Sequence, residues 1–150
     1  MLTVVHPSSS IAGTIQSGNW CGNDTIWRMI LDLNKIIIYS DKKGHICKTP
    51  QRKIFVIVDG IEAGEGEGPL EPDLIKCGLI ACGSNPVAID TILAQVMGYN
   101  YSKIPVLQNA YNIKSFPLTH FVPQDIKVST NLKELKQFKF KRPIGWRNDE

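Results

Sequence analysis

The sequence has few cysteines, and none of them are paired at the spacing of a metal or cluster motif. The four are Cys21, Cys47, Cys77 and Cys82, with no CxxC pair and the nearest two five positions apart. Structural zinc and iron–sulfur clusters are held by thiolates at short, repeated spacings. We therefore expect these cysteines to be small buried side chains, and we expect no iron–sulfur cluster in this chain.

The chain also lacks any apolar run of the roughly 18 residues that a membrane-spanning helix needs. Its start, MLTVVHPSSS, has neither the basic residues nor the apolar stretch of a signal peptide. The net charge is only +3, with the basic residues gathered near the C-terminus. These features predict a cytoplasmic protein that binds neither membrane nor nucleic acid. The 150 residues suit a single domain, with a basic tail over residues 139–150.

What the sequence does contain is a succession of helix and strand patterns. Apolar spacing and end signals predict helices over residues 24–39, 84–98, 104–112 and 131–138. The first helix is so apolar that we expect it to be largely buried, with Asn23 or Asp24 as its cap. Strands are expected over residues 2–6, 53–59, 77–83 and, weakly, 125–128. The predicted class is α/β, a small mixed or mostly parallel sheet with helices packed on it.

Residues 58–73, VDGIEAGEGEGPLEPD, fall in a stretch of about eighteen residues that separates two predicted strands. Long structureless loops in compact domains are usually functional or disordered. Gly60, Gly66 and Gly68 would let the backbone approach a ligand closely. The acids, among them Glu65, repel phosphate and suit a hard divalent cation. A functional loop and a mobile, solvated acidic loop are both open readings.

Two aspartates and one helix start complete the candidate site. Asp59 directly follows a predicted strand, where α/β sheets gather ligands, although an Asp-Gly pair can also simply begin a turn. Asp90 falls inside the apolar arc of the helix over residues 84–98, so it needs a cation or a hydrogen-bond donor, which a neighbouring backbone could supply. The helix start at Asn85 is suited to an anion, with Arg28 as a further contact. The expected metal ligands are Asp59, Glu65 and Asp90, with Asp59 and Asp90 as alternative acid–base groups.

Three stretches resemble the family called domain of unknown function 362. They are GNDTIWRMILDLNKI, VDGIEAGEGEGP and GSNPVAIDTILAQVMGY followed by KIP, and the resemblance covers about residues 18–110. Matching residues are Asn23, Asp24, Trp27, Arg28, Asp59, Gly60, Glu65, Gly66, Gly68, Asn85, Pro86 and Asp90. The resemblance implies an α/β part before these motifs, so this chain is similar to the family's C-terminal portion or to a shortened member.

The resemblance implies no settled reaction, so whether the chain is an enzyme is left open. We expect a ligand or divalent-metal site between the acidic loop and the helix start, which takes a small anionic ligand. The expected ligand-binding residues are Asn23, Asp24, Arg28, Gly60, Gly66, Gly68 and Asn85. One alternative is a non-catalytic fragment or partner-binding module, whose first helix packs on a missing N-terminal domain or a second copy. Another is an accessory protein of iron–sulfur redox systems.

Overall fold

The structure, a computed structural model, describes residues 25–68, 70–131 and 137–143. The predicted strand over residues 2–6, the candidate residues Asn23 and Asp24 and most of the helix predicted over 131–138 lie outside these ranges. The described elements, in chain order, are α2 (Ile26–Tyr39), β1 (Val56–Glu67), β2 (Glu71–Gly83), α3 (Pro86–Val96), η1 (Tyr101–Lys103), α4 (Pro105–Ala110) and η2 (Pro123–Asp125). None of the described helices is long and apolar enough to cross a bilayer.

Helix α2 ends where predicted but begins two residues later, and the predicted cap at Asn23 or Asp24 is wrong: Thr25 occupies the N-cap position, with no side-chain hydrogen bond there. The guanidinium of Arg52 binds the C-terminal carbonyls of α2, and its positive charge suits the negative end of a helix dipole. Arg52 Nη1 donates to Ile37 O at 2.6 Å and to Ser40 O at 2.8 Å. The segment before β1 is thereby fastened to the end of α2.

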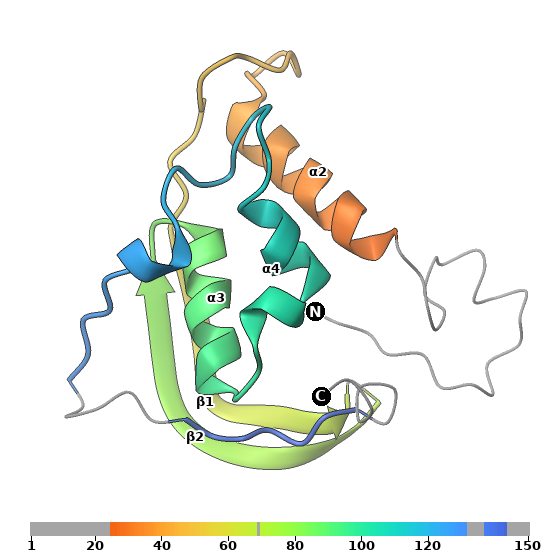
Figure 1. The fold of residues 1–150 in the computed structure, drawn as a ribbon, viewed down its shortest axis with the longest axis vertical. Helices are drawn as coiled ribbons and strands as arrows, with labels where there is room; N and C mark the ends of the chain where they lie inside the picture. Colours follow the sequence, from red (N-terminus) through yellow and green to blue (C-terminus); the bar gives the residue numbers. More distant parts are fainter. Residues whose placement is uncertain (1–24, 69, 132–136, 144–150) are drawn as a thin grey trace, which may run out of the picture.

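The prediction that α2 is largely buried is wrong. Within this helix only Leu31 and Tyr39 are buried. Helix α4 packs against α2 (Figure 1), while several large apolar side chains of α2 remain exposed. About half of each side chain is exposed for Met29, Leu33, Ile36 and Ile37. The apolar arc of the sequence therefore exceeds the surface that the described fold covers.

The sheet is a long two-stranded antiparallel hairpin, so the prediction of a mostly parallel sheet is wrong. Strands β1 and β2 pair from Val56 with Gly83 to Glu67 with Glu71. The predicted loop of about eighteen residues is therefore strand, apart from residues 68–70. The register shifts between Gly60 and Glu62, as in a β-bulge, which bends and twists a ribbon. Figure 1 shows the hairpin curving beneath the three helices.

The strands are less buried than expected. Side chains alternate between half-buried and exposed along most of β2. The outward side includes apolar residues more than 60% exposed, namely Ile57, Leu74 and Ile80. Of the described cysteines, Cys82 is exposed and Cys47 and Cys77 are half-buried, so the expectation of buried cysteines is wrong for Cys82.

The core lies between the three helices. One cluster contains Leu31, Val87, Ala110 and Leu118, and a second contains Ala94, Ile104 and Leu107. The fully buried Thr91 of α3 donates to Val87 O and bonds the Tyr111 hydroxyl, each at 2.7 Å. Thr91 is therefore a polar residue whose hydroxyl is satisfied inside the core.

Two further predictions concern the C-terminal part. The weak strand predicted over residues 125–128 is wrong, because the 3₁₀ helix η2 ends at Asp125 and no strand follows in the described residues. The short helix predicted over 104–112 is confirmed as α4. Residues 137–143, which include the start of the predicted basic tail, run beside the hairpin (Figure 1).

Candidate functional site

Asp59 lies within β1 rather than at the start of a loop. Its residue pairs with Ile80 of β2, and its exposed side chain accepts a hydrogen bond from the Ile61 amide at 3.0 Å. The neighbouring Gly60 pairs with Leu79 just before the bulge. The side chain of Asp59 thus bonds to its own strand at a point where the ladder is irregular.

Glu65 is held by the C-terminal segment. Its Oε2 accepts from the Lys141 amide at 2.8 Å, and its Oε1 lies 3.8 Å from the Lys141 ammonium. Gly66 has a φ of 75° and donates its amide to Lys141 O at 3.1 Å. Two of the predicted site residues are therefore engaged by residue 141, far along the chain.

Asp90 lies on α3, and no described residue donates a hydrogen bond to it. Its side chain is in contact with water, yet the surrounding protein removes enough solvent to raise the pKa of its carboxyl above the ordinary value. The described residues contain no group of three histidine, cysteine, aspartate or glutamate side chains that could hold a metal ion. Asp59, Glu65 and Asp90 do not form such a group in them, and a metal site stays a prediction from the sequence.

Asn85 is the N-cap of α3, as predicted. Its Oδ1 accepts from the Ala88 amide at 3.0 Å, and its Nδ2 donates to Leu118 O at 2.9 Å. Pro86 follows at the first helical position, where its missing N–H leaves nothing unsatisfied. The amide side chain thus joins the helix start to the loop after α4.

Arg28 lies on α2, where its guanidinium sits 4.2 Å from the ring centroid of Trp27. Asp32, expected at pairing distance from Arg28, forms an ion pair with Lys35 at 2.9 Å. Asn34 donates to Ile30 O in its own helix at 2.9 Å. None of these contacts joins Arg28 to Asp59, Asp90 or Asn85.

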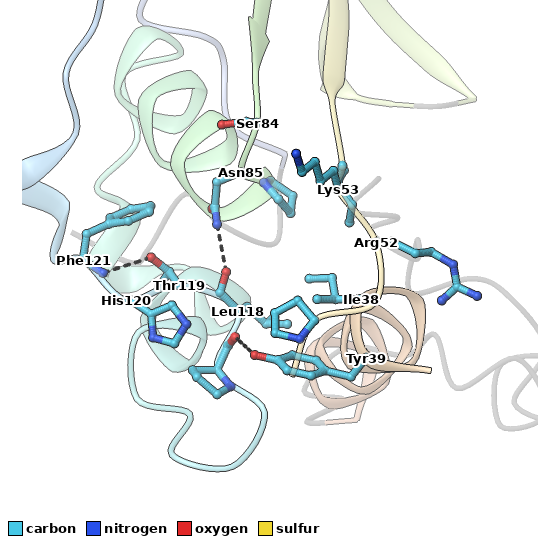
Figure 2. Close-up of a pocket in the computed structure, with 14 residues that line it drawn as sticks. Ile38, Tyr39, Arg52, Lys53, Ser84, Asn85, Leu118, Thr119, His120 and Phe121 are labelled. Atoms are coloured by element: carbon cyan, nitrogen blue, oxygen red, sulfur yellow. Dashed lines mark hydrogen bonds between the residues drawn. The ribbon is translucent and has the colours of Figure 1, made fainter. Parts of the chain in front are cut away.

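A cleft of about 340 Å³ opens at the start of α3 (Figure 2). Three parts of the chain form its walls: the end of α2, the segment before β1, and the loop after α4. The residues that line it are Ile38, Tyr39, Pro50, Arg52, Lys53, Ile54, Ser84, Asn85, Pro86, Pro117, Leu118, Thr119, His120 and Phe121. Tyr39 anchors one wall, because its hydroxyl donates to Pro117 O at 2.7 Å.

The charges in this cleft have one sign. Its titratable lining side chains, apart from the tyrosine, are Arg52, Lys53 and His120, and no described lining residue is acidic. Arg52 is bonded to the end of α2. Among the described residues, Lys53 and His120 are the basic lining residues whose side chains make no hydrogen bond or ion pair. In Figure 2 the Lys53 amine points toward the start of α3.

None of these basic residues stood out in the sequence. QRK, residues 51–53, lies at the start of a predicted strand, and its two basic residues could have been considered together with the helix start at Asn85. His120 gave no such signal, since it stands alone in a loop and enters the cleft only because Leu118 is tied to Asn85.

Comparisons with known proteins give one match. A family described as Domain of unknown function (DUF362) matches residues 6–95, which is more than half of the chain. The matched range contains all the site residues predicted from the sequence and also Arg52 and Lys53, whereas His120 and Lys141 lie beyond it. No curated protein and no solved structure gives a significant match.

Proposed function

Because this chain belongs to the family of domain of unknown function 362, whose description carries no reaction, we propose a function from its geometry: it binds a small anionic ligand in the cleft at the start of α3. The observation that carries this proposal is the charge of the lining, where Lys53 and His120 meet a helix N-terminus without a nearby carboxylate in the lining. The helix end contributes a partial positive charge of its own.

The ligand is recognised mainly by side chains. Asn85 already satisfies the Ala88 amide, and Pro86 has no amide hydrogen to offer. The first turn of α3 therefore supplies few free donors, and the ammonium of Lys53 must provide much of the attraction. The lining also includes apolar residues such as Leu118 and Ile54.

Binding of inorganic phosphate and of malonate, followed by NMR titration, tests the proposal. Lys53→Met keeps the aliphatic stem and removes the charge, and we expect it to weaken binding by about five-fold or more, since one partly exposed charge contact is worth about 1 kcal/mol. His120→Gln should also weaken binding, because it removes a second basic side chain from the lining. Lys114→Met, an exposed lysine of the same loop region outside the cleft, is the matched control.

The outcome that contradicts the proposal is equal binding by Lys53→Met and Lys114→Met. Shift changes confined to residues far from Ser84, Asn85 and Thr119 would contradict it as well, because these residues line the cleft.

The metal-dependent version of this function is retained as a separate hypothesis. In that version Asp59 and Asp90 serve as ligands or acid–base groups, with Glu65 as a further ligand. It rests on the acidic pattern and on the position of Asp90 in α3, and it requires a rearrangement that brings these carboxylates together. The iron–sulfur accessory function finds no support in the positions of the described cysteines.

A partner-binding module is the second candidate, and a specific observation favours it. Helix α2 has a face of half-exposed apolar side chains, and the outward side of the hairpin has another. A strand that is apolar on both sides is typical of a sheet covered on both faces. Another domain or a second copy of the chain would supply that cover.

A further inference from the structure

Residues 137–143 connect two parts of the fold that are distant in sequence. On one side they bond to the end of α3, where Phe138 N donates to Val96 O at 2.7 Å and Phe140 N donates to Met97 O at 2.8 Å. The two phenylalanine rings meet edge to face, with centroids 6.4 Å apart. Both rings are half-buried. This side of the segment is held by backbone bonds and apolar packing.

The other side of the segment is held by ion pairs together with bonds to the Lys141 backbone. Lys141 Nζ lies 2.8 Å from Asp73 on β2 and 3.8 Å from Glu65 on β1, so one ammonium spans both strands near the hairpin tip. The Lys141 backbone adds three bonds: its amide donates to Glu65, and its carbonyl accepts from the Gly66 amide and, at 3.3 Å, from the Tyr99 hydroxyl. The ammonium of Lys141 and the carboxylate of Asp73 are both well exposed, whereas the Glu65 side chain is only 12% exposed.

We propose that residues 137–143 form a charge-dependent strap, anchored on α3 by Phe138 and Phe140 and releasable from the hairpin tip at Lys141. Exposed ion pairs weaken as salt screens them, whereas apolar and backbone contacts do so much less. The contact with Asp73 raises the pKa of Lys141, and the same contact lowers the pKa of Asp73, so both groups are charged at neutral pH.

The strap also controls whether Glu65 is available. While it is closed, one carboxylate oxygen accepts from the Lys141 amide and the other faces the Lys141 ammonium. When the tip is released, Glu65 loses this internal cation and becomes accessible to an external one. The strap therefore covers the Glu65 carboxylate, which is only 12% exposed.

Amide hydrogen exchange of the full chain, resolved by NMR, tests the strap. Lys141→Met removes the charge and keeps the stem, and we expect it to speed exchange at Gly66 by about three-fold, the range of an exposed ion pair. Exchange at Phe138 and Phe140 should stay unchanged, because their bonds to α3 do not involve this charge. Added salt should speed Gly66 exchange in the parent protein and have little effect in Lys141→Met.

Two further variants complete the design. Lys139→Met, in the same segment, is the matched control and should leave Gly66 unchanged. Asp73→Asn removes the shorter ion pair and should give an intermediate rate at Gly66. Equal rates in Lys141→Met and Lys139→Met would overturn the proposal, as would release of Phe138 and Phe140 together with Gly66, since the segment would then open as one unit.

Discussion

Asp90 is the predicted site residue whose pKa its surroundings shift. A carboxylate on an otherwise apolar part of a helix either finds a partner or carries an energetic cost when it ionises. In the described residues no donor reaches it, and desolvation raises its pKa. Asp90 is exposed in the described fold, and a carboxylate whose pKa is shifted is a candidate for function.

We predict that Asp90→Asn stabilises the protein at neutral pH. The raised pKa means that the folded chain holds this proton more tightly than the unfolded chain, so stability falls as pH rises through the interval above the ordinary value of 3.8. Asparagine does not ionise and avoids this loss. The gain in the free energy of unfolding, measured by urea denaturation, should be present at pH 7 and absent below pH 3.8.

Asp59→Asn is the comparison for that experiment, because Asp59 is exposed on β1 and bonded to the Ile61 amide. If Asp90→Asn gives no larger gain at pH 7 than Asp59→Asn, the desolvation argument is contradicted. The same two variants, titrated with Mg²⁺, Mn²⁺ or Ni²⁺ by calorimetry, examine the metal hypothesis, which is lost if neither variant changes the affinity.

At the scale of elements, the start of α3 is both a helix cap that the sequence predicts and a contact between distant parts of the chain. SNP predicts a capped helix start, and the structure confirms it. The same asparagine also donates to Leu118 O, a contact 33 residues away that local pattern does not contain. Because Leu118 belongs to the core and to the cleft lining, the cap positions both.

We predict that Asn85→Ala lowers the free energy of unfolding by about 1–2 kcal/mol, the sum of a lost cap and a lost hydrogen bond. It should also weaken anion binding at the cleft, because the Leu118 loop would lose its tie to α3. Thermal and urea denaturation give the first effect, and phosphate titration the second. Asn112→Ala is the control. Asn112 is exposed and its side chain donates to Gln108 O in the last turn of α4, and this substitution should lower the free energy of unfolding much less.

The hairpin is the element that sequence reasoning missed. Glycine, aspartate and glutamate have low strand propensity, so VDGIEAGEGEGPLEPD reads as a loop when taken alone. Cross-strand pairing and the strap override that preference. Gly78 contributes as well, since its φ of 62° in β2 lies opposite the register shift and permits the bend.

At the scale of the whole molecule, the described fold leaves many large apolar side chains exposed outside its core. The core clusters lie between the helices, while α2 and the outward side of the hairpin carry large exposed apolar side chains. Contiguous surfaces of this kind usually mark an interface. An interface on α2 would explain why the sequence predicts burial of this helix although the described fold leaves much of it exposed.

We predict that the protein associates through α2. Leu33→Glu combined with Ile37→Glu places charges one helical turn apart on the exposed face, and it should reduce association in sedimentation velocity by about ten-fold, as for an interface core. The free energy of unfolding of the monomer should change by less than about 0.5 kcal/mol, since both side chains are half-exposed.

Val122→Glu, at an equally exposed apolar residue of the loop before η2, is the control. A parent protein that stays monomeric at every concentration, and that binds no other protein domain through α2, would contradict this prediction.

The sequence by itself determined α2, α3 and α4, the cap at Asn85 and the membership of the family. These features depend on local periodicity, on short-range capping and on motif order, all of which are written along the chain. Only the tertiary structure decided that the acidic segment is a hairpin, that Lys141 holds Glu65, and that Lys53 and His120 share a cleft. Those depend on contacts between distant residues, whose free energy outweighs local propensity and leaves little trace in any one segment.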